Sequence, residues 1–230
     1  MAAYALEHPI AAVDVVVFRV HQERLEVLLH RRREDPYQGI FALPGVAVRV
    51  DETLEKAAKR ALSEKIEWPE DMLKFIYFEQ LAAFDAIFRD PRGRTISIAY
   101  LALISEQLDL PTQEGLQWKA AAGLAPGSLP FDHDQIVAAA VTRLQGKIRY
   151  TNIAQAFLPE TFRIDELHKV YETILGHELN LANFRTKLLK LELIELVRVL
   201  TEPPTEKGGR PPHLYRFKQD LLATVERDFL

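Results

Sequence analysis

The first half of the chain alternates between short apolar runs and one stretch of helical periodicity. Residues 11–20 (AAVDVVVFRV) and 25–33 (LEVLLHRRR) are rich in Val and Leu, and they predict two strands joined by a tight turn at HQER. Apolar residues recur every three or four positions between 53 and 65, which predicts an amphipathic helix with Thr53 as its N-cap. Residues 75–85 and 95–105 predict two more strands around the turn DPRGR. Strands that alternate with helices indicate an α/β domain.

The pattern changes after a stretch rich in chain breakers, residues 123–130. Helical periodicity then predicts four helices, over residues 132–146, 152–157, 164–175 and 181–193. Gly176 and Asn180 are expected as the C-cap and N-cap between the last two helices, and strand-like segments follow at 193–200 and 213–218. Two helices joined by a short turn and followed by a hairpin form the winged helix-turn-helix arrangement. We therefore expect a first domain at residues 1–130 and a second at 131–230.

Composition and charge constrain the class of protein. The chain of 230 residues has a formal net charge of -4 and no cysteine, so disulfides, thiolate metal sites and cysteine nucleophiles are excluded. No apolar run approaches transmembrane length and residues 1–10 lack the features of a signal peptide, so we expect a cytoplasmic, soluble protein with no membrane partner. Residues 183–218 contain 8 basic and 4 acidic residues. A locally basic segment in an acidic protein favours nucleic acid as a partner.

One motif points to a known enzyme fold without its chemistry. Residues 43–68, LPGVAVRVDETLEKAAKRALSEKIEW, resemble the Nudix box, G-x5-E-x7-R-E-U-x-E-E-x-G-U with U aliphatic. The resemblance implies an α/β Nudix fold, in which helices sandwich a mixed sheet. The three metal-binding carboxylates of that family fall at Ala61, Glu64 and Lys65. Magnesium-type cations need several converging oxygen ligands, and Lys65 would repel them. We therefore expect no catalytic residue, no metal and no cofactor, and a sensor domain rather than an enzyme.

Longer stretches extend the resemblance over most of the chain. QLAAFD, RDPRGRTISIAYLAL, the run from FDHDQIV to KLELIE, and GGRPPHLYRFK resemble the Nudix-related transcriptional regulators of NAD metabolism. This resemblance implies a homodimeric repressor whose Nudix domain binds ADP-ribose or a related nucleotide and whose winged helix binds double-stranded operator DNA. Two alternatives stay open. One is a regulator of a sugar-utilisation operon that senses a sugar or sugar phosphate, and the other is a weak Nudix pyrophosphohydrolase that uses Glu52 and Glu64.

Cations after the second predicted strand are candidates for binding an anionic ligand. Arg31, Arg32 and Arg33 precede the loop of the Nudix box, where an arginine fork can pair with a diphosphate, and at least one of the three is expected to be solvated. The QL-x-x-F and DPRGR stretches of the family border its ligand pocket or dimer interface, and a hairpin salt bridge is their simpler role. The candidate ligand-binding residues are Arg31, Arg32, Arg49, Glu52, Glu64, Phe84 and Arg94.

The helix predicted at 181–193 has one apolar and one polar face. Leu181, Phe184, Leu188 and Leu191 share the face expected to pack on the preceding helix. The opposite face carries amide, hydroxyl and ammonium groups that either contact phosphates and base edges or simply face solvent. Residues 207–210, KGGR, predict a wing tip suited to a narrow minor groove. The candidate DNA-binding residues are Lys147, Arg149, Asn183, Arg185, Thr186, Lys187, Lys190, Lys207 and Arg210.

Overall fold

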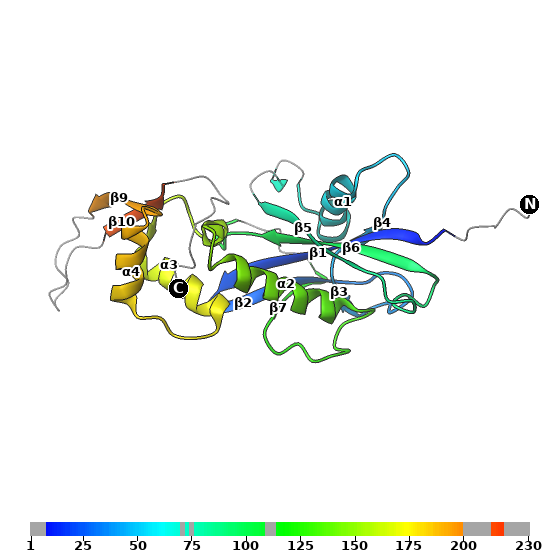
Figure 1. Cartoon of the computed structure of the whole chain (residues 1–230). Helices are drawn as coiled ribbons and strands as arrows, with labels where there is room; N and C mark the ends of the chain where they lie inside the picture. The colour runs from blue at the N-terminus through cyan, green and yellow to red at the C-terminus, as the bar shows by residue number, and fades with distance from the viewer. Residues whose placement is uncertain (1–7, 70–71, 74–75, 109–113, 200–212, 219–230) are drawn as a thin grey trace, which may run out of the picture. The chain divides into compact units, whose positions relative to one another are not determined.

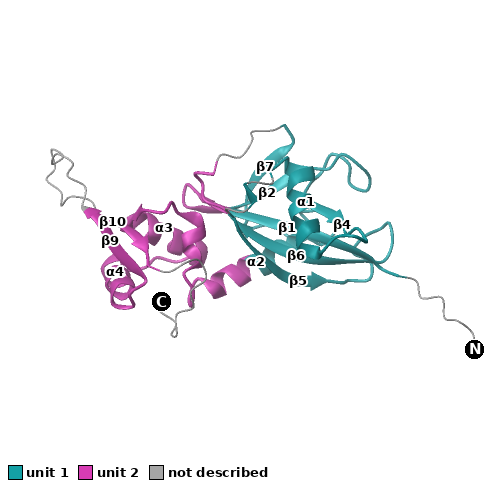
Figure 2. Cartoon of the chain, turned by 90° about the horizontal axis from the view of Figure 1, so that it is seen from above, with its two compact units in different colours: residues 1–18, 26–103, 110–140 teal, residues 19–25, 104–109, 141–230 magenta. Residues whose placement is uncertain are grey.

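Figure 1 shows the computed structural model of the chain, which describes residues 8–69, 72–73, 76–108, 114–199 and 213–218. The chain forms two compact units (Figure 2). Unit 1 comprises residues 1–18, 26–103 and 110–140, and unit 2 comprises residues 19–25, 104–109 and 141–230. The boundary expected after residue 130 stays a prediction. The compact units divide ten residues later, inside a helix, and two short segments of the first half belong to unit 2.

Unit 1 is built on one mixed sheet of seven strands. The strands are β1 (Ile10–His21), β2 (Arg24–Arg31), β3 (Phe41–Ala42), β4 (Gly45–Ala47), β5 (Tyr77–Phe84), β6 (Thr95–Leu103) and β7 (Leu116–Ala120). Their order is β3-β2-β1-β6-β5, with β4 paired to β1 and β7 paired to β2. β1 runs parallel to β6, whereas β4, β3, β7 and β5 pair antiparallel with their partners. The four strands predicted from the apolar runs are confirmed.

Two helices cover opposite faces of this sheet (Figure 1). They are α1 (Leu54–Ile66) and the first half of α2 (His133–Lys147). The buried side chains of β1, from Val13 to Phe18, show why both faces need cover, since a strand that is apolar on both sides must be buried on both. Thr53 caps α1 as predicted, because its hydroxyl accepts a hydrogen bond from the backbone N–H of Lys56 at 3.3 Å. The helix ends where Glu67 adopts a left-handed conformation, with φ of 53°.

Unit 2 contains the predicted helix pair and hairpin. Its elements after α2 are the 3-10 helix η2 (Ile153–Phe157), β8 (Phe162–Arg163), α3 (Ile164–Leu175), α4 (Leu181–Lys190), β9 (Ile194–Val199) and β10 (His213–Phe217). The three strands form a sheet in the order β8-β10-β9. Gly176, with φ of 75°, ends α3, and the Asn180 side chain accepts a hydrogen bond from the N–H of Asn183. Both predicted caps are confirmed.

The predicted end of the last helix is wrong. The helix was expected to reach residue 193, but α4 stops at Lys190 because Glu192 adopts a left-handed conformation, with φ of 54°. Leu193 then turns inward and is buried at the start of the strand hairpin. Leu193 fits the helical spacing of apolar residues only by chance, because the turn at Glu192, and not the helix, places its side chain in the interior.

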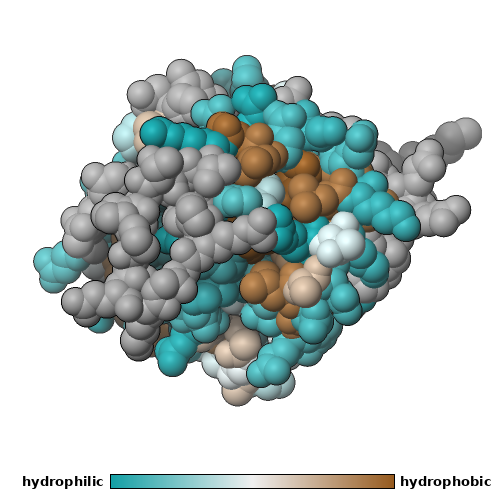
Figure 3. All heavy atoms as spheres, turned by 90° about the vertical axis from the view of Figure 1, so that its left-hand side faces the viewer, coloured by the Kyte–Doolittle hydropathy of each residue, from teal (hydrophilic) through white to brown (hydrophobic). Residues whose placement is uncertain are grey.

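The predicted apolar face of α4 is also only half right. Phe184 and Leu188 are buried, and the Phe184 ring lies edge-on against Tyr171 of α3 with centroids 5.0 Å apart. Leu181 and Leu191 are 43% and 38% exposed. Only the middle of the stripe is covered, because the contact with α3 centres on Phe184 and the two leucines lie at the ends of a ten-residue helix. In a space-filling view of this end of the chain, the mostly hydrophilic surface is broken by hydrophobic patches (Figure 3).

Candidate functional site: a cationic hollow beside helix α1

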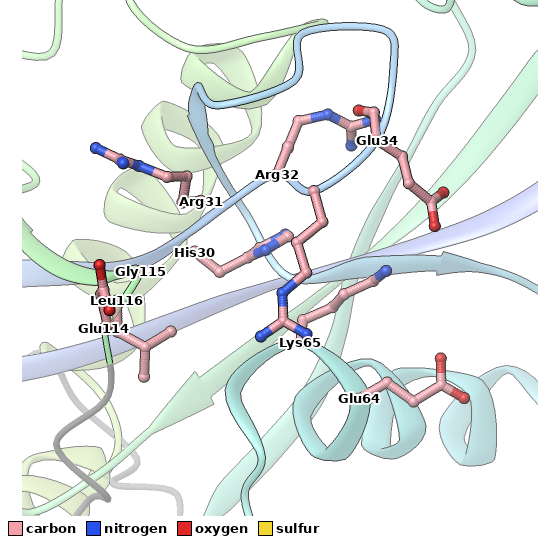
Figure 4. Close-up of a pocket in the computed structure, with 10 residues that line it drawn as sticks. His30, Arg31, Arg32, Glu34, Glu64, Lys65, Glu114, Gly115 and Leu116 are labelled. Carbon is pink, nitrogen blue, oxygen red and sulfur yellow. The ribbon is translucent and has the colours of Figure 1, made fainter.

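Two adjoining hollows open beside α1 in unit 1. The first, about 540 Å³, is lined by the start of β1, by β4 and α1, and by residues 89–92 and 131–133. The second, about 570 Å³, lies between the end of β2, α1 and the start of β7 (Figure 4). Arg32, Glu34, Glu64 and Lys65 line both. The sheet edge and the helix therefore enclose a cavity large enough for a nucleotide-sized ligand.

A buried polar cluster lines the first hollow, and the sequence analysis did not identify it. Arg89 donates hydrogen bonds from Nε and Nη2 to both carboxylate oxygens of Asp132, at 2.9 and 2.6 Å, and from Nη2 to Asp14 at 3.2 Å. The Ser97 hydroxyl donates to the same Asp14 oxygen, Oδ2, at 2.6 Å. The cluster joins β1, the segment after β5, β6 and the start of α2. Its sequence signal was a single acid, Asp14, inside an otherwise apolar strand.

His133 completes this cluster and holds a defined tautomer. The backbone N–H of Leu43 donates to Nδ1 of His133 at 3.0 Å, so Nδ1 must be the acceptor and Nε2 carries the proton. Nε2 lies 3.4 Å from Oδ1 of Asp14. Burial would raise the pKa of Asp14, but the interactions with His133, Ser97 and Arg89 outweigh it and lower the pKa to about 2. Asp14 is therefore an anion at neutral pH, with its charge balanced inside the fold.

Gly45 lets β4 approach this cluster, and replacing it is a test of the packing. A Cβ at position 45 would lie 2.1 Å from Oδ1 of Asp14 and 2.8 Å from the carbonyl oxygen of Val13. We expect Gly45→Ala to destabilise the protein by about 1–3 kcal/mol, since backbone or a buried carboxylate must move. The matched control is Gly146→Ala in α2, where nothing lies within 4 Å and alanine should be neutral or stabilising. Thermal unfolding compares the two, and equal melting temperatures for both variants would contradict the close approach.

The surviving charged residues of the Nudix box form an ion-pair network. Arg60 donates from Nε and Nη2 to Glu52 at 3.0 and 2.6 Å, from Nη2 to the carbonyl of Ala47 at 2.8 Å, and from Nη1 to Glu64 at 3.1 Å. Arg49 also donates to Glu64, at 3.3 Å. The hydrogen bonds from Arg60 lower the pKa of Glu52 to about 2. The network ties α1 to the loop after β4, so Arg60 and Glu52 act here as a structural clamp.

The residues at the three metal-ligand positions do not fit a divalent cation. The Ala61 side chain offers no oxygen ligand and is completely buried. Glu64 already accepts hydrogen bonds from two guanidinium groups, and Lys65 brings a positive charge. Within the described ranges, no group of three or more His, Asp or Glu residues is placed to hold a metal ion. The lining of the hollow therefore presents cationic side chains in place of converging metal ligands.

Four candidate ligand residues line the hollows and three do not. Arg31, Arg32, Arg49 and Glu64 line at least one hollow. Glu52 instead pairs with Arg60, and Phe84 lies at the end of β5 opposite Ser97. Arg94 donates to the main-chain carbonyl oxygens of Asp85 and Ala86, at 2.6 and 3.3 Å, so its contact with the hairpin is not a salt bridge. The ligand-binding role of all seven residues stays a prediction. Arg33 is solvated, with its side chain 85% exposed and a distant partner in Glu67 at 3.9 Å.

In unit 2, the polar face predicted for α4 is exposed. Its four residues, at positions i, i+3, i+4 and i+7, are Asn183, Thr186, Lys187 and Lys190. The Thr186 hydroxyl donates to the carbonyl of Ala182 at 2.8 Å, which leaves its lone pairs as acceptors. Arg185 is half-buried, and its buried Nε has no hydrogen-bond partner within the described part of the chain.

Of the other DNA-binding candidates, the structure describes only Lys147 and Arg149. Lys147 is the last residue of α2 and Arg149 follows it, both half-buried. Thr151 joins this segment to η2, because its hydroxyl donates to the carbonyl of Lys147 at 2.7 Å and accepts from the N–H of Ile153 at 3.3 Å. Lys207 and Arg210 of the predicted wing tip lie outside the described residues. Contact of these residues with DNA stays a prediction.

The fold and the site define a class: a Nudix domain with a degenerate metal site, followed by a winged helix. The NUDIX domain family matches residues 8–140, and the NrtR DNA-binding winged helix domain family matches residues 154–217. The chain belongs to the NrtR family of Nudix-related transcriptional regulators. No helix in the described segments has the length and hydropathy needed to span a bilayer.

Three proteins illustrate the similarity. The ADPR responsive transcriptional repressor NtrR of Acinetobacter baylyi is 34% identical over 91% of this chain and 82% of its own length. The crystal structure of Shewanella oneidensis NrtR with a 27mer DNA superposes with a TM-score of 0.77, at 31% identity, over 95% of this chain and 98% of that one. The NUDIX domain of the same protein, solved with ADP ribose, gives a TM-score of 0.51 at 32% identity and covers 63% of this chain and 94% of that one. An ADP-ribose pyrophosphatase of Methanocaldococcus jannaschii is 32% identical over 56% of this chain and 72% of its length.

Proposed function

We propose that this protein is an ADP-ribose-responsive repressor that controls genes of NAD metabolism. Its Nudix domain binds the effector without hydrolysing it, and its winged helix binds operator DNA as part of a homodimer in the cytoplasm. The observation that carries the proposal is the pairing, in one chain, of a nucleotide-sized cationic hollow lacking metal ligands with a winged helix that exposes a polar helix face. One relative named as an ADPR responsive repressor, and the DNA and ADP ribose complexes of Shewanella oneidensis NrtR, support it.

Helix α2 is the proposed route between effector and DNA. It begins at His133, whose side chain belongs to the polar cluster that lines the first hollow, and its residues after 140 belong to unit 2. A ligand that favours one arrangement of the cluster would shift the start of this continuous helix. By linkage, the effector then changes the affinity for DNA by the same factor as DNA changes the affinity for effector.

The proposal predicts that ADP-ribose weakens binding to the operator without being consumed. In a titration with DNA from upstream of the gene, we expect ADP-ribose to lower the affinity by about 5- to 150-fold, which is the usual range of such coupling. After incubation with magnesium, chromatography should recover the ADP-ribose intact. Ribose 5-phosphate is the control ligand and should leave DNA binding unchanged.

Two results would contradict this reading. Hydrolysis at an ordinary enzyme rate, on the order of 1 per second, would make the first domain a pyrophosphohydrolase like the Methanocaldococcus relative. A response to the sugar phosphate with none to ADP-ribose would make the protein a regulator of sugar utilisation.

A further inference from the structure

The first hollow holds more cations than its own acids balance. Six arginine or lysine side chains and four carboxylates line it. Three of the carboxylates, those of Asp14, Glu64 and Asp90, already accept hydrogen bonds from arginine side chains of the same lining. The fourth, Glu34, is exposed. Arg60 and Arg89 also pair with Glu52 and Asp132, which do not line the hollow, so the lining differs from neutral only where individual cations contact no carboxylate.

The two lining cations that contact no carboxylate among the described residues are Arg32 and Lys65. Arg32 donates to the carbonyl oxygens of Pro36 and Glu34, at 2.7 and 3.4 Å, and lies over the Phe131 ring at 4.9 Å. Lys65 extends from α1 toward the segment that carries His30 and Arg32 (Figure 4). Neither residue pairs with a carboxylate in the part of the chain that the structure describes. Arg32 and Lys65 each line the two hollows, so they lie where the hollows adjoin.

We propose that Lys65, together with Arg32, binds the diphosphate of the ligand in the place where related enzymes use a metal ion. The inference rests on the proposed function, which supplies a nucleoside diphosphate as the ligand. A carboxylate at position 65 would need a divalent cation to bridge it to phosphate. An ammonium group contacts the phosphate oxygens directly, and the planar Arg32 guanidinium offers a fork to the second phosphate.

The neighbours of Lys65 agree with this role. His30 is buried, and burial followed by the nearby charge of Lys65 lowers its pKa to about 4, so the imidazole adds no charge at neutral pH. Glu64 is the carboxylate nearest in sequence, but Arg49 and Arg60 occupy it at 3.3 and 3.1 Å. The ammonium group of Lys65 thus keeps its hydrogen-bond donors for a ligand. Because the cation is part of the chain, binding of the diphosphate requires no magnesium.

The test measures the affinity for ADP-ribose and for inorganic pyrophosphate by calorimetry, in EDTA and in magnesium. We expect wild-type protein to bind both ligands in EDTA, with no gain from magnesium. Lys65→Ala should weaken both by about tenfold or more, the usual effect of losing a hydrogen bond to a charged group. Lys65→Glu should weaken them further, whereas Glu34→Gln should tighten binding by up to about threefold.

Lys56→Ala is the matched control, because Lys56 is an exposed lysine of the same helix that does not line either hollow. Its affinity should equal that of wild type, and unchanged melting temperatures should show that the variants fold. Unchanged affinity of Lys65→Ala, or a requirement of the wild type for magnesium, would overturn the role of Lys65 and leave the repressor function intact. If pyrophosphate bound in a way that depends on Lys65 but ADP-ribose did not bind, the diphosphate site would be supported. The proposal that ADP-ribose is the effector would then be wrong.

Discussion

Arg89→Met is expected to destabilise the Nudix domain by about 3–5 kcal/mol, the usual loss when one partner of a buried ion pair is removed. The Arg89 side chain is only 3% exposed and is the cation shared by Asp14 and Asp132. Methionine keeps most of the volume but leaves two carboxylates without their guanidinium. A loss of this size should lower the melting temperature by about 6–20 °C in a chain of this length.

The pH dependence of stability gives a second readout for this variant. The pKa of Asp14 is lowered in the folded state to about 2, from 3.8. Asp14 therefore contributes stability that is fully present above pH 3.8 and is lost as the pH falls from 3.8 toward 2. Without Arg89 the folded-state pKa rises, so acid unfolding of the variant should begin at a higher pH than in wild type.

Arg92→Met is the control for Arg89→Met. Arg92 lies three residues along the same segment and pairs with Asp90 at 2.7 Å, but its side chain is 57% exposed. Its partner Asp90 is only 5% exposed but keeps a hydrogen bond from the backbone N–H of Arg92 at 3.0 Å, so the removal should cost about 1–2 kcal/mol, less than that of Arg89. If calorimetry found the same free energy of unfolding for the two variants, the large contribution expected from the buried cluster would be contradicted.

The double variant Lys187→Ala, Lys190→Ala is expected to weaken operator binding by about 60-fold at 0.1 M salt. Both lysines are exposed on the polar face of α4 and form no ion pair among the described residues. Each phosphate neutralised contributes about 0.9 to the slope of log affinity against log salt, so each lysine is worth nearly a factor of ten at 0.1 M. The slope should therefore fall by about 1.8 units. Fluorescence anisotropy on the upstream DNA at several salt concentrations measures both quantities.

A charge-matched control separates contact from net charge. Lys169 and Lys218 also belong to unit 2, but they pair with Glu23 at 2.6 Å and Glu192 at 3.6 Å. Replacing both by alanine removes the same charge and should change affinity and salt slope little. Equal losses in the two double variants would mean that α4 does not read DNA through this face. Asn183→Ala should instead flatten sequence preference more than non-specific affinity, because an amide can bond base edges.

The sequence by itself determined the helices, four of the seven strands of unit 1, the strand hairpin of unit 2 and the loss of the metal site, but not the short strands β3, β4, β7 and β8. Strand alternation, helical spacing and caps act over a few residues, which is why Thr53, Gly176 and Asn180 were assigned correctly. The degenerate box needed only an alignment of residue types at Ala61, Glu64 and Lys65. The exposed polar face of α4 followed from helical spacing alone.

Only the tertiary structure decided which polar residues meet. Asp14 and Ser97 are 83 residues apart and Asp14 and Arg89 are 75 apart, and they converge because β1 runs parallel to β6 with Asp14 opposite Ala99. The structure likewise ended α4 at Lys190 and left Leu181 exposed. It also left the charge of Lys65 without an acidic partner among the described residues, beside Arg32. These outcomes depend on strand register and on packing between distant segments, and a local pattern contains neither.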